Sequence, residues 1–194
     1  MSTQILYHLF GVAGYWHRSF ENDGGEIHWV LERPRAKLRC AACGNSAVVK
    51  KGVHWRRIRT VPVARKAVFL EVPVHRLLCR VCGTLALEVC PLVEGQRFHT
   101  KALERLAVEL CRRMTIQDTA QYLGLSWDTV KAMDRRYLER RFDPPSIRGV
   151  QYVAIDEIAV RKGQSYLTVV LDLDTGRVLH VGQGKGVDAV APFF

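Results

Sequence analysis

The sequence lacks any hydrophobic run of the about 18–20 residues that a membrane-spanning helix needs. The best candidate, residues 5–16, is interrupted by His8, Gly11 and Gly14. The N-terminus also lacks the basic lead-in and the small-residue cleavage site of a secretory signal peptide. These absences predict a soluble, cytoplasmic chain with no membrane partner.

Acidic residues are missing from a long central stretch. Residues 33–70 carry eleven basic side chains and no acidic one, in a chain of 194 residues with a net charge of +10. Hydrophobic residues make up 48% and charged residues 25%, which excludes a wholly disordered chain. Concentrated positive charge favours a polyanionic partner, and a merely solvated basic face is the plain alternative.

Four of the six cysteines form two CxxC pairs, each followed by glycine. They are Cys40, Cys43, Cys79 and Cys82. Two intervening residues let both thiolates of a pair reach one tetrahedral ion, so the pairs predict a structural zinc (Zn²⁺) site. Disulfides are disfavoured in the cytoplasm, and a thioredoxin-like redox motif needs a single pair near a βαβ unit. We expect Cys90 and Cys111 to pack rather than to bind metal.

The residues between and before the pairs read as strands. Alternating apolar residues over 68–74 predict a hairpin that returns the second pair to the first. Residues 22–25 (Asn-Asp-Gly-Gly) predict another hairpin turn. Together they indicate a β-rich zinc-binding domain over 1–96. Within it, the basic stretch 50–59 could hold phosphates with Trp55 stacking, but burial of Trp55 beneath the zinc site is the favoured interpretation.

From residue 100 the apolar period becomes helical, with Thr100 as a helix N-cap. Residues 116–133 then fit a helix-turn-helix, in which Gly124 makes the turn and Ser126 caps the second helix. This predicts a helical DNA-binding domain over 97–142, with a generic three-helix unit as the alternative. The residues expected to contact double-stranded DNA are Trp127, Lys131, Arg135, Arg136, Arg140 and Arg141.

A proline-containing break over 143–149 predicts a linker. Residues 150–194 then read as three strands, the first ending in Asp156 and Glu157. Side chains alternate across a strand, so these two carboxylates should face opposite ways. Asp172 and Asp174 flank a turn, where aspartate is favoured for local hydrogen bonding.

The order of these features resembles bacterial insertion-sequence transposases of the ISL-three family. The most specific motifs are Ile155-Asp156-Glu157, Arg161-Lys162-Gly163 and the segment 166–179. The resemblance implies a multidomain α+β chain whose third part begins a ribonuclease-H-like α/β catalytic domain. It implies that Asp156 is the first of three acidic residues that hold Mg²⁺ or Mn²⁺ for phosphoryl transfer.

The resemblance also implies that the protein recognises the terminal repeats of the insertion sequence. Whether the chain forms a homo-oligomer is not decided by the sequence. The chain ends before a second and third catalytic acid, so we expect a fragment or truncated product that binds DNA without cutting it. The rival interpretations are a zinc-dependent DNA-binding regulator without catalytic activity and a thiol redox protein.

Overall fold

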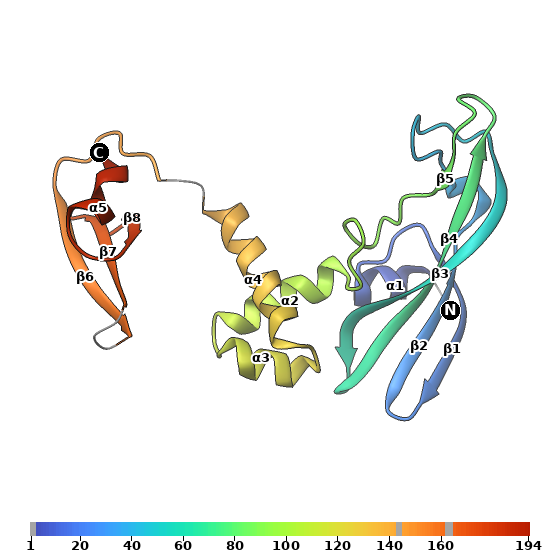
Figure 1. Ribbon diagram of the computed structural model, residues 1–194. Helices are drawn as coiled ribbons and strands as arrows, with labels where there is room; N and C mark the ends of the chain where they lie inside the picture. The colour runs from blue at the N-terminus through green and yellow to red at the C-terminus, as the bar shows by residue number, and fades with distance from the viewer. Residues whose placement is uncertain (1–2, 143–144, 162–164) are drawn as a thin grey trace. The chain divides into compact units, whose positions relative to one another are not determined.

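A computed structural model describes residues 3–142, 145–161 and 165–194. The chain is mixed α and β and divides into two compact units, Met1–Tyr137 and Leu138–Phe194 (Figure 1). Residues 143 and 144 of the predicted linker, and Lys162 and Gly163 of the Arg161-Lys162-Gly163 motif, lie outside the described residues. The predicted boundary at 96/97 falls inside the first unit.

The first unit contains a five-stranded sheet built from two hairpins. β1 (Trp16–Asp23) and β2 (Glu26–Glu32) join through Gly24 and Gly25, whose φ angles of 53° and 92° suit a hairpin turn. This confirms the turn predicted at 22–25. β2 then runs parallel to β4, so the order in the sheet is β1-β2-β4-β3.

A long hairpin of β3 (Val48–Val63) and β4 (Lys66–Cys79) dominates this sheet. Its tip is Ala64–Arg65, both at positive φ. The short β5 (Leu85–Leu87) pairs with the far end of β4. The alternation predicted for β4 is confirmed, since its core-facing residues Val68, Leu70, Val72 and Val74 are all buried.

The N-terminal helix α1 (Thr3–Phe10) was not predicted, because its eight residues show too little periodicity beside β-rich neighbours. Its buried Leu6 and Phe10 join the core of the sheet, and the Phe10 ring meets the Trp29 ring edge-on at 5.3 Å. A single-turn 3₁₀ helix, η1 (Arg35–Lys37), leads from the sheet toward the first cysteine pair. Cys90 is buried in the same core beside the Tyr15 hydroxyl, which agrees with a packing role.

Trp55 corrects one expectation. Its side chain is 44% exposed rather than buried beneath the zinc site. The neighbouring Ile58 lies opposite Leu70 and shares its core face, so the period-2 alternation of β3 places Trp55, opposite Pro73, on the outer face. The sequence did not reveal which face of β3 the core would take.

Three helices complete the first unit: α2 (Lys101–Cys111), α3 (Ile116–Leu123) and α4 (Trp127–Arg141), the last of which crosses the boundary between the units. The second unit is an antiparallel sheet in the order β6-β7-β8, formed by β6 (Val153–Arg161), β7 (Ser165–Asp172) and β8 (Val178–Gln183). The short α5 (Val187–Val190) and η2 (Ala191–Phe193) follow it.

Candidate zinc site and DNA-binding helices

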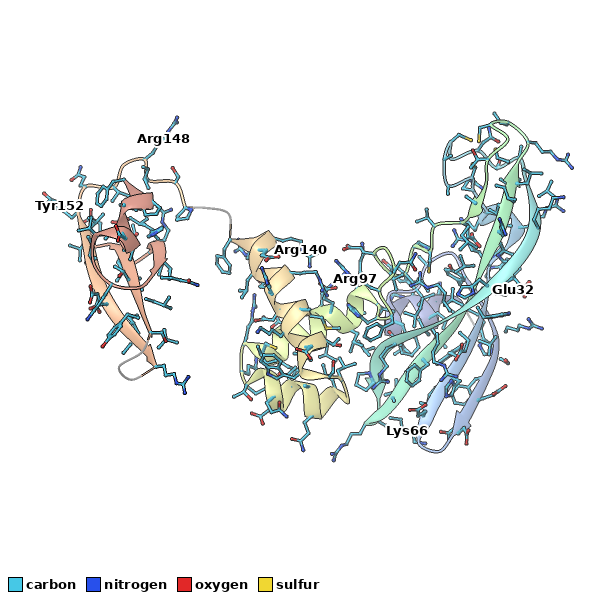
Figure 2. The ribbon with its side chains drawn as sticks, viewed as in Figure 1. Glu32, Lys66, Arg97, Arg140, Arg148 and Tyr152 are labelled. Atoms are coloured by element: carbon cyan, nitrogen blue, oxygen red, sulfur yellow. The ribbon has the colours of Figure 1, made fainter. Side chains whose placement is uncertain are left out.

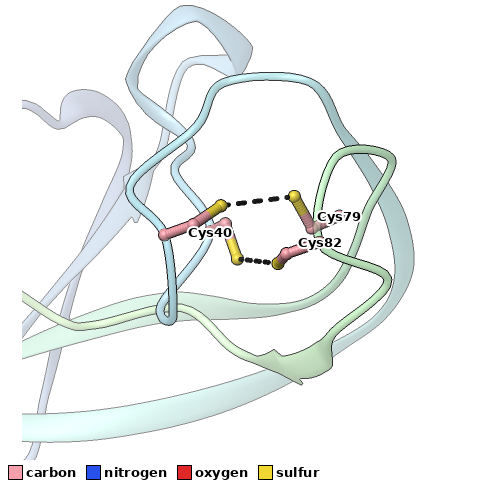
Figure 3. Close-up of side chains that lie close together, drawn as sticks. Cys40, Cys79 and Cys82 are labelled. Atoms are coloured by element: carbon pink, nitrogen blue, oxygen red, sulfur yellow. Dashed lines mark hydrogen bonds between the residues drawn. The ribbon is translucent and has the colours of Figure 1, made fainter.

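The four predicted cysteines converge at one end of the β3–β4 hairpin (Figure 3). The Sγ atoms of Cys40 and Cys82 lie 3.6 Å apart, as do those of Cys43 and Cys79. All four Sγ atoms fall within 4.8 Å of one another. A tetrahedral zinc ion with bonds of about 2.3 Å needs sulfurs about 3.8 Å apart, so this arrangement fits one four-coordinate ion.

Each cysteine pair is shaped by the same tight turn. The Gly44 N–H donates to the Cys40 carbonyl at 2.9 Å, and the Gly83 N–H donates to the Cys79 carbonyl at 3.1 Å. Both glycines have φ near 70°, a conformation that side chains other than glycine rarely adopt. The Thr84 hydroxyl and backbone, together with the Cys43 thiol, lower the pKa of Cys82 to about 6, whereas hydrogen bonds with the other three thiols raise the pKa of Cys43. Without a metal, the thiols thus share protons unequally within the cluster.

The helix-turn-helix forms as predicted. Thr100 Oγ1 accepts from the Leu103 N–H at 3.3 Å and caps α2. Gly124 ends α3 in the left-handed conformation at φ 62°, and Ser126 Oγ accepts from the Thr129 N–H at 3.2 Å to begin α4. Val130 and Met133 are fully buried on the inner face of α4.

The outer face of α4 carries most of the residues predicted to contact DNA. Trp127 and Lys131 lie together, with the Lys131 ammonium 4.6 Å from the indole centroid. Arg135, Arg140 and Arg141 are also exposed, and Figure 2 labels Arg140 near the end of this helix.

Arg136 differs from the others because it is half-buried. Its Nε lies 3.4 Å from the buried Glu104 carboxylate, which also lies 3.5 Å from Arg97 and from His99. Burial is the main cause that lowers the pKa of His99 in this cluster. Arg136 therefore ties α4 to α2, whatever part it has in binding DNA.

Nothing in the sequence distinguishes Arg59 from the other basic residues of the stretch 50–59. It is 7% exposed, and its Nη2 donates at 3.0 Å to the Leu123 carbonyl at the end of α3. Burial lowers its pKa. Nearby, the Thr60 and Thr100 hydroxyls lie 3.0 Å apart. The Arg59 contact attaches the end of α3, just before the turn at Gly124, to the sheet. The Thr60 contact attaches the start of α2 to the same strand.

In the second unit, Asp156 lies on β6 opposite Val169 and is exposed. Its Oδ1 accepts from the Glu157 N–H at 2.8 Å, whereas the Glu157 carboxylate reaches the Gly186 N–H at 3.2 Å. Among the described residues, the cysteine cluster is the only group of three or more metal-binding side chains. Asp156 therefore belongs to no cluster of three or more such side chains in this part of the chain.

Asp172 has the turn role expected from the sequence. Its carboxylate accepts from the Thr175 hydroxyl at 2.6 Å and from the Asp174 N–H at 3.1 Å. The Thr175 hydroxyl is the main cause that holds the pKa of Asp172 below its usual range. The Asp172 carboxylate thus forms its hydrogen bonds within the β7–β8 turn.

Family models match three segments of the chain in the predicted order. Residues 36–82 match the zinc-finger of transposase IS204/IS1001/IS1096/IS1165, and residues 89–138 match the helix-turn-helix domain of transposase family ISL3. Residues 153–194 match a model described as transposase. No solved structure matches the chain.

Two curated relatives are similar along most or all of the chain. The transposase for insertion sequence element IS1001 from Bordetella parapertussis is 30% identical over 100% of this chain and 48% of its own length. The transposase for insertion sequence element IS1557 from Mycobacterium tuberculosis (strain CDC 1551 / Oshkosh) is 29% identical over 90% of this chain and 40% of its own. The chain thus spans about half the length of the curated relatives it matches.

A cysteine cluster at the end of a hairpin, in one compact unit with a helix-turn-helix, is typical of zinc-containing DNA-binding proteins. The family models and the relatives narrow this class of proteins to one family. The chain belongs to the ISL3 family of transposases. None of the described helices has the length and apolar character needed to cross a membrane.

Proposed function

We propose that the chain is the DNA-recognition portion of an insertion-sequence transposase together with the start of its catalytic domain. The layout is a zinc-binding domain over 1–96, a helix-turn-helix domain over 97–142, a linker over 143–149 and a ribonuclease-H-like domain that begins at 150. The observation that supports this proposal is the exposed basic face of α4. This helix is part of a helix-turn-helix that is bonded to the sheet through Arg59.

The recognition helix α4 reads the terminal repeats of the element. Trp127, Lys131 and Arg135 lie on the exposed face of its first three turns, where a recognition helix meets base edges. Arg140 and Arg141 at its far end contact phosphates, which position the protein without reading sequence.

Zinc is structural, because four cysteines complete its coordination and leave no open position for substrate. Asp156 supplies one carboxylate ligand for Mg²⁺ or Mn²⁺ in a complete catalytic domain. Such ions activate the attacking oxygen and stabilise the leaving oxygen of a phosphodiester. Among the described residues Asp156 is part of no cluster of three or more metal-binding side chains, so β6 offers a ligand to a larger set.

The test is binding of the chain to duplexes that do or do not carry the element's terminal repeat. Lys131→Ala and Arg135→Ala should each lower the preference for the repeat by about 5- to 150-fold. Arg140→Ala and Arg141→Ala should weaken all duplexes alike and reduce the salt slope by about one unit per contact.

Arg105→Ala is the matched control, since Arg105 is an exposed base on α2 rather than α4. It should leave both affinity and preference nearly unchanged. If the chain does not distinguish the repeat, or if Arg105→Ala has the same effect as Lys131→Ala, the recognition role of α4 is wrong.

A further inference from the structure

The outer face of the first sheet contains a hollow of about 420 Å³ that the helix-turn-helix does not use. Its wall is formed by residues of β1 to β4 and the adjoining Arg33, including Trp55, Val53, Pro73, Arg18, Lys50 and Glu32. Figure 2 labels Glu32 at the end of β2. The hollow is therefore a feature of the sheet alone.

Two irregularities in the strands supply its basic side chains. The register between β1 and β2 shifts between His17 and Ser19, where Arg18 is inserted. The register between β3 and β4 shifts between Lys50 and Gly52. Such bulges redirect side chains out of the regular alternation, and both Arg18 and Lys50 line the hollow.

The charges around the hollow divide into occupied and available groups. Arg33 and His75 both bind the buried Glu88, at 2.6 and 2.8 Å. Arg18 and Lys50 are exposed and form no ion pair within the described part of the chain. Glu32 is the one acidic group of the lining. The hollow thus presents two available cations beside an exposed indole.

We propose that this hollow binds an unpaired nucleotide of single-stranded DNA, with its base stacked on Trp55 and its phosphates at Arg18 and Lys50. Aromatic platforms beside basic side chains bind single strands in this way, because every base has a flat face. The apolar Val53 and Pro73 beside the indole suit a base better than a phosphate. The volume suits a small ligand rather than a duplex. The inference extends the proposed DNA-binding function to a second site.

The test uses the full zinc-loaded chain and fluorescence anisotropy at low salt. The probes are a fluorescent oligothymidylate of about 20 nucleotides and a duplex of about the same length. Trp55→Leu should weaken oligothymidylate binding by about 5- to 150-fold and change duplex binding by less than about threefold. Trp55→Phe, which keeps an aromatic face, should restore single-strand binding.

Trp16→Leu is the matched control, because Trp16 is an exposed indole (55%) of the same sheet outside the hollow. It should bind both probes as the unchanged chain does. Zinc content and circular dichroism establish that each variant is folded.

The inference is wrong if the chain does not bind oligothymidylate, if Trp55→Leu behaves as Trp16→Leu does, or if it weakens the duplex as much as the single strand. Loss of single-strand binding in Trp55→Leu supports the hollow even if no duplex is bound. Absence of duplex binding instead counts against the recognition role of α4, so the two failures are distinguishable.

Discussion

Arg57 and Arg59 form a natural matched pair for testing how the helices are held to the sheet. They lie two positions apart on the same face of β3, and both guanidinium groups lie over the Phe69 ring, at 5.5 and 5.0 Å. The Arg57 side chain is 60% exposed, whereas Arg59 is 7% exposed and reaches the end of α3. We expect Arg59→Leu to destabilise the first unit far more than Arg57→Leu.

The magnitude for Arg59 follows from its contacts. A hydrogen bond from a charged group contributes about 1.5–3 kcal/mol, and its loss leaves the Leu123 carbonyl without this donor. The buried contact with Phe69 adds about 1–2 kcal/mol. Relief of the desolvation that lowers the Arg59 pKa offsets part of this sum. The expected net loss in unfolding free energy is about 2–4 kcal/mol.

The magnitude for Arg57 is smaller because solvent screens its interaction. Its Nε lies 2.8 Å from the Glu71 carboxylate, but the guanidinium group is mostly exposed. Exposed ion pairs contribute about 0–1 kcal/mol. Arg57→Leu should therefore cost less than about 1 kcal/mol.

Urea unfolding of the zinc-loaded chain, followed by tryptophan fluorescence, measures both effects. With a slope of about 2 kcal/mol per molar urea, Arg59→Leu should lower the midpoint by about 1–2 M, and Arg57→Leu by less than about 0.5 M. Equal shifts in the two variants, or a shift below about 0.5 M for Arg59→Leu, would refute the assignment of Arg59 as the link between sheet and helices.

Three further predictions concern the metal, the second unit and catalysis. Protein purified under reducing conditions should contain one zinc per chain. Removal of the zinc should cost on the order of 10 kcal/mol of folding free energy and unfold the cysteine end of the sheet. The control variant Cys111→Ser should keep the metal, and purified protein without zinc would contradict the site. Gly182→Ala should destabilise the second unit, seen as faster amide exchange in β8, because a Cβ there would lie 1.9 Å from the Ala189 carbonyl oxygen; Gly52→Ala, with 3.9 Å of room, is the control. The 194-residue chain should not nick a terminal-repeat duplex with Mg²⁺ or Mn²⁺, since two-metal chemistry needs several carboxylates; nicks that disappear in Asp156→Ala would show that the site is complete.

Local signals in the sequence predicted most of the elements that form the site. The cysteine spacing, the glycine turn at Gly124 and the caps Thr100 and Ser126 each depend on a few neighbouring residues, so they were readable without a structure. The hairpin at Gly24–Gly25 was predicted for the same reason.

The features that sequence missed depend on contacts between distant residues. Arg59 meets Leu123 across 64 positions, and nothing in a run of basic residues marks one member as buried. The exposure of Trp55 depends on which face of β3 meets the core, a choice made by partners on β4. Helix α1 is stabilised mainly by burial of Leu6 and Phe10, because eight residues form a marginal helix on their own.

The pairing register of the long β3–β4 hairpin links its two ends. β3 spans 16 residues, or about 50 Å at about 3.3 Å per residue, with the cysteines at one end and the Ala64–Arg65 turn at the other (Figure 1). A slip of one residue between the strands would exchange their faces, turning Ile58 outward and Arg59 into the apolar core. Because Cys40 and Cys43 precede β3 and Cys79 ends β4, a metal bound by both pairs opposes that slip. A metal held by both cysteine pairs would thus preserve the strand register in which Arg59 faces the Leu123 carbonyl at the end of α3.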